Sequence, residues 1–327
     1  MNIYLIVLVS LIVASYVYLK LAVKFKIIDK PNQRSSHTKI TVRGGGIIFP
    51  IAILLFYFFN DYQYTYFVLG VFLLSVISFL DDIYTLSSKI RFPFQLIGVL
   101  LTLYQIGVTF LPISSIILFI FLLMLGVGIV NMFNFMDGIN GITGIYSLSV
   151  LSGFFMVNYQ ENLLDQDLII YVGISILVFG FYNFRKKALF FAGDIGSISL
   201  GVLVVFLGLF LAYKLSAPII IMIVMVYGAD AGCTLLYRKF YTNESIFDPH
   251  RHHMYQKLVD VYKIPHLNVS IIYAVLQMLI NIVVLKTYHF DLKTQILVFL
   301  AFMFFFIFCY ILLFKKIKKS LSLNNAG

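Results

Sequence analysis

Two polar segments in this 327-residue chain carry oxygen side chains at spacings suited to a hard cation. Asp81 and Asp82 are adjacent at the end of an apolar segment, where two carboxylates repel each other unless a cation or a donor compensates. We interpret the pair as a metal site, a general base or both, against the alternative of a solvated helix end. In segment 131–141 such side chains recur every third residue, which would place them on one helix face: Asn131, Asn134, Asp137 and Asn140.

Two further segments suit phosphate. Residues 193–197 read Gly-Asp-Ile-Gly-Ser directly before an apolar stretch, and a helix that begins there would point its backbone N–H groups at an anion. The alternative is an ordinary N-cap formed by Asp194 or Ser197. The longest hydrophilic loop, 237–266, contains a cluster of cationic and imidazole side chains: His250, Arg251, His252 and His253. Such a cluster suits phosphate, and a zinc site is the competing interpretation.

The amino-terminal polar loop, residues 24–45, adds several cations and runs into three consecutive glycines at 44–46. Its Lys and Arg side chains suit anionic lipid headgroups, although membrane topology alone would also explain them. Three glycines before an apolar segment indicate a close approach of two backbones or a tight re-entry.

The elements that must position these groups are membrane helices. The chain is 61% hydrophobic and 12% charged, which excludes an ordinary soluble enzyme, a disordered chain and a disulfide scaffold. The two cysteines, Cys233 and Cys309, indicate neither a disulfide framework nor a zinc site. We predict one all-α polytopic domain over 1–327 with about eleven transmembrane helices, at 2–23, 46–59, 65–80, 93–111, 112–130, 142–158, 168–184, 197–213, 217–236, 267–286 and 294–314.

Charge predicts the orientation of these helices. One set of loops, with the carboxyl-terminal tail, carries 21 of the 24 Lys and Arg residues. By the positive-inside rule this set is cytoplasmic, which places the N-terminus outside and the C-terminus inside. The net charge of +10 is therefore explained by topology rather than by nucleic acid. The polar segments all fall on the same side, so we expect phosphoryl chemistry on a lipid, from loops 24–45, 81–92, 131–141, 185–197 and 237–266.

The ordered set of motifs resembles the polyprenyl-phosphate N-acetylhexosamine-1-phosphate transferases, bacterial glycosyltransferase family 4. It is most similar to the branch that starts O-antigen and related surface polysaccharides. The motifs span about 225 residues in the family's order. They are Asp29-x-Pro-Asn-x-Arg34-x-x-His37, Gly44-Gly45, Asp81-Asp82, Asn131-x-x-Asn134-x-x-Asp137-Gly138, Gly193-Asp194-x-Gly196-Ser197 and the loop of His250 to His253.

The resemblance implies a reaction at the cytoplasmic face of the bacterial inner membrane. Undecaprenyl phosphate would attack a UDP-N-acetylhexosamine, with UDP-GlcNAc as the expected donor, and UMP would leave. Mg²⁺, or Mn²⁺ in its place, would be the cofactor, and a homodimer is what the family suggests. By motif, Asp194 and Asn134 would hold the metal, and Asp81, Asp82 and Asp137 would be catalytic. Substrate-binding residues would be Phe191 (stacked on uracil), Asn131, Asn140, Lys39, His250, Arg251 and His253.

Departures from the family pattern leave alternatives open. Many bacterial members have Asp where this chain has Asn140, so an acid's role there is in doubt. His253 matches a family histidine in both registers of the loop. The chain lacks the all-histidine loop of the cell-wall-precursor transferases, which disfavours UDP-MurNAc-pentapeptide as donor. A 6-deoxy-N-acetylhexosamine donor is another alternative. A cation-dependent transporter would place its ionisable residues at mid-span, unlike this chain.

Overall fold

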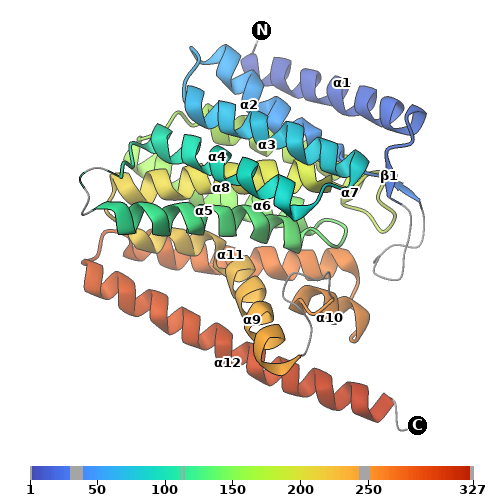
Figure 1. The fold of residues 1–327 in the computed structure, drawn as a ribbon, viewed down its shortest axis with the longest axis vertical. Coiled ribbons are helices and arrows are strands. Elements are labelled where there is room, and N and C mark those ends of the chain that lie inside the picture. Colours follow the sequence, from blue (N-terminus) through green and yellow to red (C-terminus); the bar gives the residue numbers. More distant parts are fainter. Residues whose placement is uncertain (1, 30–39, 111, 113–114, 243–250, 325–327) are drawn as a thin grey trace.

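The computed structural model describes residues 2–29, 40–110, 112, 115–242 and 251–324. The described chain is almost entirely helical (Figure 1), as the composition predicts. Its α-helices are α1 Ile3–Lys24, α2 Ile48–Phe59, α3 Thr65–Tyr84, α4 Ser88–Ile106, α5 Ile116–Met136, α6 Ile142–Glu161, α7 Asp167–Asn183, α8 Gly193–Lys214, α9 Met225–Tyr241, α10 Met254–Asp260, α11 His266–Thr287 and α12 Leu292–Asn324. Two 3₁₀ segments, Gly45–Ile47 and Pro218–Val224, lead into α2 and α9.

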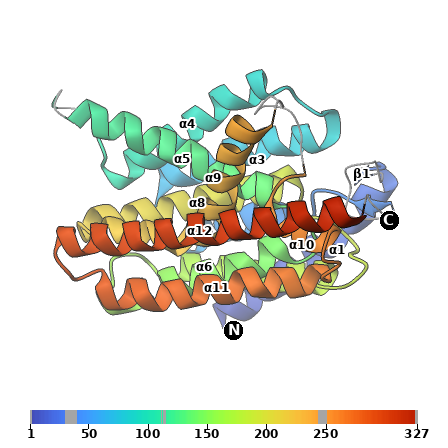
Figure 2. The same cartoon turned by 90° about the horizontal axis from the view of Figure 1, so that it is seen from below.

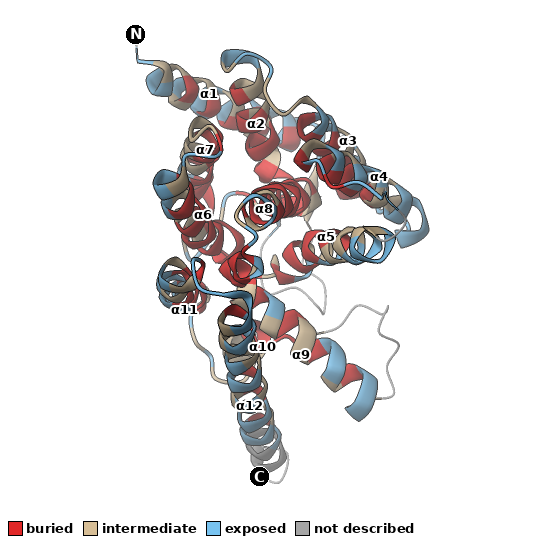
Figure 3. Cartoon of the chain, turned by 90° about the vertical axis from the view of Figure 1, so that its left-hand side faces the viewer, coloured by how far each residue is buried: buried red, intermediate tan, exposed pale blue. Residues whose placement is uncertain are grey.

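Helix α8 forms the centre of the bundle. Viewed along the helices, it is surrounded by α2 to α7 and is buried over nearly its whole length (Figure 3). Its packing partners include α3, α4 and α5 on one side and α2 and α6 on the other. The N-terminus of α8 is the Gly-Asp-x-Gly-Ser segment, so the fold gives this motif a fixed place among several helix ends.

The carboxyl-terminal helices lie at one edge. In Figure 2, α12 crosses the molecule, where it packs against Pro218–Val224 and α9, and α9 leans away from the main helix direction. Most of α12 is exposed, and large apolar side chains are exposed on α1 and α11 as well. An outer surface this apolar is typical of contact with lipid rather than water.

The eleven predicted apolar stretches each overlap a described helix, which confirms an all-α polytopic membrane protein in outline. Within the described residues, eight helices are long and apolar enough to cross a membrane, and Gly45–Phe59 and Asp167–Asn183 are shorter apolar helices. The bounds differ by a few residues from the approximate ones expected, as at α5, which begins at Ile116 rather than near 112. The count of eleven spans and their orientation stay predictions.

A small strand pair lies beside the helix ends. Strand β1, Ile28–Asp29, pairs antiparallel with β2, Thr41–Val42. Val42 also forms a parallel bridge to Phe190, immediately before α8. This pairing ties the amino-terminal loop to the segment that leads into α8.

Candidate active site

The N-terminus of α8 is capped by a carboxylate from another helix. Asp82 Oδ1 accepts a hydrogen bond from the Asp194 N–H at 2.9 Å, and Asp82 Oδ2 accepts one from the Ile195 N–H at 3.1 Å. The sequence alone suggested Asp194 or Ser197 as the cap. Asp82 takes that role instead, because the first N–H groups of a helix need acceptors from outside it and α3 supplies a buried carboxylate.

The glycines at 44–46 allow two backbones to meet. Gly45 donates its N–H to the Phe191 carbonyl at 2.8 Å, and Gly46 donates to the Ala192 carbonyl at 2.9 Å. A Cβ on Gly46 would lie 2.4 Å from the Cα of Gly196, so only glycine fits there. The sequence-based expectation of a close backbone approach at these glycines is thus confirmed.

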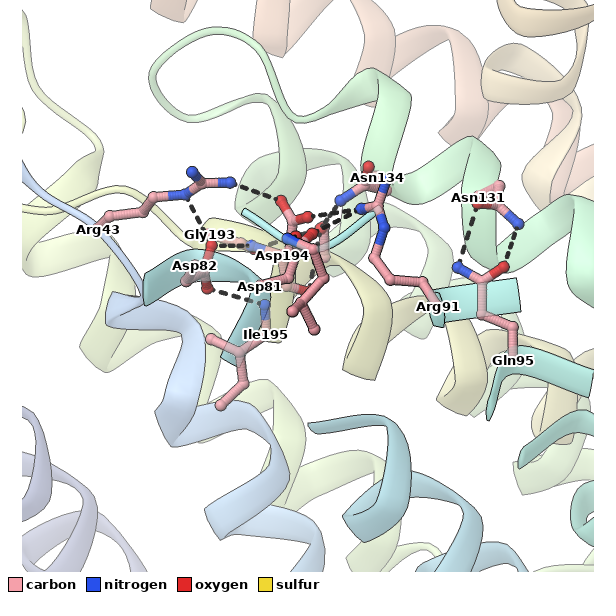
Figure 4. A network of polar contacts seen from close by, with 12 residues as sticks. Arg43, Asp81, Asp82, Arg91, Gln95, Asn131, Asn134, Gly193, Asp194 and Ile195 are labelled. Carbon is pink, nitrogen blue, oxygen red and sulfur yellow. Dashed lines mark hydrogen bonds and ion pairs between the residues drawn. The ribbon is translucent and has the colours of Figure 1, made fainter. Parts of the chain in front are cut away.

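Two arginines join the three carboxylates at this helix end (Figure 4). Arg43 contacts Asp82 Oδ1 through Nε at 2.7 Å and Asp194 Oδ1 through Nη2 at 3.0 Å. Arg91 contacts Asp81 Oδ2 at 2.6 Å and Asp194 Oδ2 at 3.1 Å, both through Nη1. Each arginine therefore bridges Asp194 to one member of the Asp81-Asp82 pair.

The Asp194 side chain is the focus of this cluster. Its charge interacts with the Asp81 carboxyl group and with the nearby Asn134 amide. Asn134 Nδ2 donates a hydrogen bond to Ser197 Oγ at 3.2 Å. The Arg91 guanidinium, which contacts both carboxylates, offsets the repulsion between Asp81 and Asp194. Oxygen donors of this kind suit Mg²⁺. Among the described residues, however, no group of three or more His, Cys, Asp or Glu side chains stands in an arrangement that could hold a metal ion.

Asp137 lies at the end of α5, close to this cluster. The helix ends at Met136, so Asp137 is its C-cap and Asn140 follows in the loop. The expectation of four oxygen side chains on one helix face is therefore wrong for Asp137 and Asn140. The helix has ended before them, and Gly141 has a left-handed backbone conformation. Desolvation raises the pKa of the Asp137 carboxyl to about 6, although a hydrogen bond from Thr143 at 2.6 Å acts in the opposite direction.

Asn131 and Asn140 serve packing contacts. The Asn131 amide exchanges two hydrogen bonds with Gln95 of α4, at 2.9 and 3.2 Å, on the far side of Arg91 in Figure 4. The buried Asn140 amide donates to the carbonyls of Arg185 and Lys186. The structure brings neither amide to the Asp194 cluster, although Asn140 also lines the pocket described next.

A pocket of about 1150 Å³ opens beside the site. Phe191 lines it, whereas the neighbouring Phe190 is buried and stacks on Tyr182. Four lysines and a histidine also line it, from the end of α1 and the turn after it, the loop before α8 and the start of α11: Lys20, Lys26, Lys186, Lys187 and His266. One phenyl ring among several cationic side chains suits an anionic ligand with a flat ring.

The residues of the histidine loop have partners of their own. Arg251 forms a two-pronged ion pair with Asp260, at 3.0 Å through Nε and 2.8 Å through Nη2. His253 is buried, and its Nδ1 lies 3.2 Å from Asp230 Oδ1. The predicted contacts of Lys39 and His250 fall outside the described residues.

Sequence reasoning passed over Arg91 and treated Arg43 only as a lipid-headgroup or topology residue. Both lie in loops where positive charge already had a sufficient explanation in membrane orientation. What distinguishes these two arginines is that each contacts two carboxylates at helix ends. The sequence does not show this, because it does not show which helix ends meet in space.

Comparisons with known proteins relate the chain to a family of transferases. Residues 64–212, which include Asp81, Asp82 and Asp194, match the model of glycosyl transferase family 4. The chain is 26% identical over 292 residues to a probable undecaprenyl-phosphate N-acetylglucosaminyl 1-phosphate transferase of Bacillus subtilis strain 168, covering 82% of this chain and 79% of that protein. It is 26% identical over 267 residues to the undecaprenyl-phosphate alpha-N-acetylglucosaminyl 1-phosphate transferase of Yersinia pestis, covering 75% and 72%.

A second group of relatives matches over a shorter span. The chain is 32% identical over 175 residues to the phospho-N-acetylmuramoyl-pentapeptide-transferase of Thermotoga maritima, covering 48% of this chain and 56% of that protein. Both groups of relatives are named as transferases that move a sugar 1-phosphate or a phospho-sugar. Together with the family model, they show that the chain is similar to glycosyl transferase family 4 over residues 64–212 and to these transferases over longer spans.

Proposed function

We propose that the protein transfers N-acetylhexosamine 1-phosphate from a UDP-sugar to undecaprenyl phosphate, with UDP-GlcNAc as the donor. The observation that carries this proposal is the position of Asp194, held between Arg43 and Arg91, with Asp81 bound to the same Arg91. Carboxylates for a cation, beside guanidinium groups for phosphate, are what phosphoryl transfer between two anions requires. The longer matches, over 79% and 72% of the relatives, are to proteins named for N-acetylglucosaminyl transfer.

In this proposal, an oxygen of the lipid phosphate forms a bond to the β-phosphorus of the UDP-sugar. The bond from that phosphorus to the bridging oxygen breaks, and UMP leaves with the electron pair. Arg43 and Arg91 offset the negative charge that gathers on the phosphoryl oxygens. Asp82 acts through the helix it caps, because its two oxygens are already committed to α8 and Arg43.

We also propose Mg²⁺ as the cofactor, held by Asp194 and Asn134 with Asp81 beside them. Bound there, the ion would offset the charge on the transferring phosphate. Phe191 would stack on the uracil ring inside the pocket, and the lysines that line the pocket would hold the diphosphate. The proposed topology has eleven spans, with this site on the cytoplasmic face of a bacterial plasma membrane. The proposed oligomeric state is a homodimer.

An assay of the purified protein tests this function. Protein in detergent is mixed with undecaprenyl phosphate, Mg²⁺ and a panel of UDP-sugars that includes UDP-GlcNAc and UDP-MurNAc-pentapeptide, and UMP release is measured. We expect release with UDP-GlcNAc, and a loss of about 10²–10³-fold or more in Asp194→Ala. The matched control is Asp61→Asn, an exposed acid between α2 and α3, which should keep full turnover.

The outcomes separate the alternatives. UMP release only with UDP-MurNAc-pentapeptide would assign the chain to the reaction named for the Thermotoga relative. No release with any donor, from protein that remains folded, would overturn the transferase proposal. Full activity in Asp194→Ala would remove the metal assignment while leaving the reaction.

A further inference from the structure

Two further acids lie side by side at the end of the bundle opposite the Asp194 cluster. Helix α7 begins there at Asp167 and ends at Asn183, whose amide donates to the Phe190 carbonyl on the active-site side. Asp165 and Asp167 are both half-buried. In the described part of the chain, neither carboxylate forms an ion pair with a lysine, arginine or histidine. No described cation therefore offsets the repulsion between them.

The two carboxylates converge on one amide. Asn60, in the loop between α2 and α3, donates from Nδ2 to Asp165 Oδ2 at 3.1 Å and to Asp167 Oδ2 at 3.3 Å. Gln63 of the same loop donates to the same Asp165 oxygen at 3.1 Å. Tyr4 of α1 donates its hydroxyl to Asp167 Oδ1 at 2.9 Å. A helix cap explains Asp165 Oδ1, which accepts from the Asp167 N–H at 3.0 Å, but it does not explain why both Oδ2 atoms face one point.

Two buried oxygen atoms beside these carboxylates have no hydrogen-bond partner within the residues that the structure describes: the Tyr171 hydroxyl and Asn60 Oδ1. Tyr171 has no exposed surface and lies one helical turn after Asp167, on the same face of α7. Helical side chains lean toward the start of their helix, and the charges of Asp165 and Asp167 act on this hydroxyl. A buried polar atom without a partner is costly, so these two oxygens indicate that a ligand belongs here.

We propose that this distal cluster, formed by Asn60, Asp165, Asp167 and Tyr171, binds a divalent cation and that the cation is Ca²⁺. A half-turn of the Asn60 amide places Oδ1 where Nδ2 now lies, so that an amide oxygen and two carboxylate oxygens face one point. Only a cation makes that arrangement favourable. The Tyr171 hydroxyl accepts a hydrogen bond from a water molecule on the ion. Carboxylates, amide carbonyls and water are the ligands that Ca²⁺ takes in proteins.

The ligand set favours Ca²⁺ over Mg²⁺. Mg²⁺ demands near-ideal octahedral geometry, whereas Ca²⁺ accepts about six to eight oxygens in flexible arrangements, such as those of a loop beside a helix start. In the proposed topology this end faces the outside, where Ca²⁺ is abundant. With only two acids among the ligands, we expect a dissociation constant of about 10⁻⁴–10⁻³ M, the range of extracellular calcium modules. The ion would join α7 to the loop between α2 and α3.

The first test is direct binding. Purified protein in detergent is dialysed to equilibrium against radioactive Ca²⁺, with excess Mg²⁺ to occupy the candidate active site. We expect one Ca²⁺ per wild-type chain and no measurable binding in the double variant Asp165→Asn/Asp167→Asn. The matched control is Asp291→Asn, an exposed acid before α12 at the same end of the bundle, which should bind as the wild type does. No binding by the wild type, or equal binding by the double variant, would overturn the proposal.

The second test adds a ligand charge, and it keeps the proposal testable if the double variant does not fold. In EDTA, Asn60→Asp places a third carboxylate beside two others, so it should unfold at a lower temperature than the wild type. Ca²⁺ should raise its unfolding temperature by more than it raises that of the wild type, and should bind at least about tenfold more tightly, because affinity rises with ligand charge. An equal loss of stability in EDTA and in Ca²⁺ would mean that Asn60 only donates hydrogen bonds, and would overturn the proposal.

The third test removes the buried hydroxyl. Tyr171→Phe deletes a polar atom that has no described partner, so its unfolding temperature in EDTA should equal or exceed that of the wild type. Its affinity for Ca²⁺ should fall by about 10-fold, as for the loss of a group that holds a ligand of the ion in place. Unchanged affinity would overturn the proposed site. None of these measurements uses UMP release, so they decide this proposal independently of the proposed function.

Discussion

Asp82 caps the helix that carries Asp194, with its carboxylate 2.9 Å from the Asp194 amide nitrogen. The two residues are 112 positions apart and lie on helices α3 and α8. One carboxylate therefore fixes the helix end from which the other projects, and Arg43 holds both. Asp82 therefore holds the site together, whereas Asp194 is the residue that would contact the substrate.

We expect Asp82 and Asp194 to differ in their effect on stability. Asp82→Ala removes the cap of α8 and a partner of Arg43, so it should lower the free energy of unfolding by about 0.5–2 kcal/mol as well as abolish UMP release. Asp194→Ala should abolish release without that loss, because it relieves the contact with Asp81. Thermal unfolding in detergent measures both, and an unchanged unfolding temperature in Asp82→Ala would contradict the capping role.

Removal of the metal should stop turnover reversibly. EDTA should abolish UMP release, and excess Mg²⁺ or Mn²⁺ should restore it. Mg²⁺ at about 100 times its dissociation constant should also stabilise the wild type by about 2.7 kcal/mol, and should not stabilise Asp194→Asn. An equal thermal shift in both proteins would place the ion elsewhere, and restoration by Zn²⁺ alone would favour the histidine loop.

The backbone contact at Gly46 predicts a sharp steric effect. Gly46→Ala places a Cβ 2.4 Å from the Cα of Gly196 and 2.8 Å from the Ala192 carbonyl oxygen. Backbone atoms cannot rotate away, so we expect a loss of about 1–3 kcal/mol and a matching drop in activity. Gly173→Ala in α7, where no atom lies within 4 Å of the added carbon, is the control and should be neutral or slightly stabilising. Equal unfolding temperatures for the two variants would be incompatible with this contact.

The Asn131 amide should matter for packing between α4 and α5. Asn131→Leu or Gln95→Leu alone leaves one amide without its partner, at a cost of about 1–3 kcal/mol. The double variant should recover much of that loss, which a double-mutant cycle in thermal unfolding detects. The KM for the UDP-sugar should stay within about twofold in Asn131→Leu. A large rise in KM without loss of stability would instead support the substrate-binding role expected from sequence.

The Asp137 carboxyl predicts a pH dependence of stability. Its pKa is raised from 3.8 to about 6, so the folded protein binds this proton more tightly than the unfolded chain does. Its contribution to stability is therefore present below about pH 4 and is lost as the pH rises through about 6, by on the order of 1–3 kcal/mol. In EDTA, Asp137→Asn should unfold at a higher temperature than the wild type at pH 7, with a smaller difference at pH 4.5. Asp61→Asn should show no such pattern, and parallel pH curves for wild type and Asp137→Asn would disprove the assignment.

The sequence by itself determined the helices and the polar segments that end them. Apolar runs long enough for a bilayer, separated by polar and glycine-rich segments, leave few alternatives to helices at those positions. The motifs also located Asp81, Asp194 and Phe191 at one group of loops, because residue type and order along the chain carry that information.

Only the tertiary structure decided which helix ends meet and which side chains are used up in holding them. The link from Asp82 to α8, the Asn131–Gln95 pair and the Asp230–His253 contact each join residues more than twenty positions apart. Helix packing and rotation set these contacts, and a helical period shows which residues share a face but not which helix that face meets. For the same reason Arg91 resembled a topology charge in the sequence, and in the fold it bridges Asp81 and Asp194.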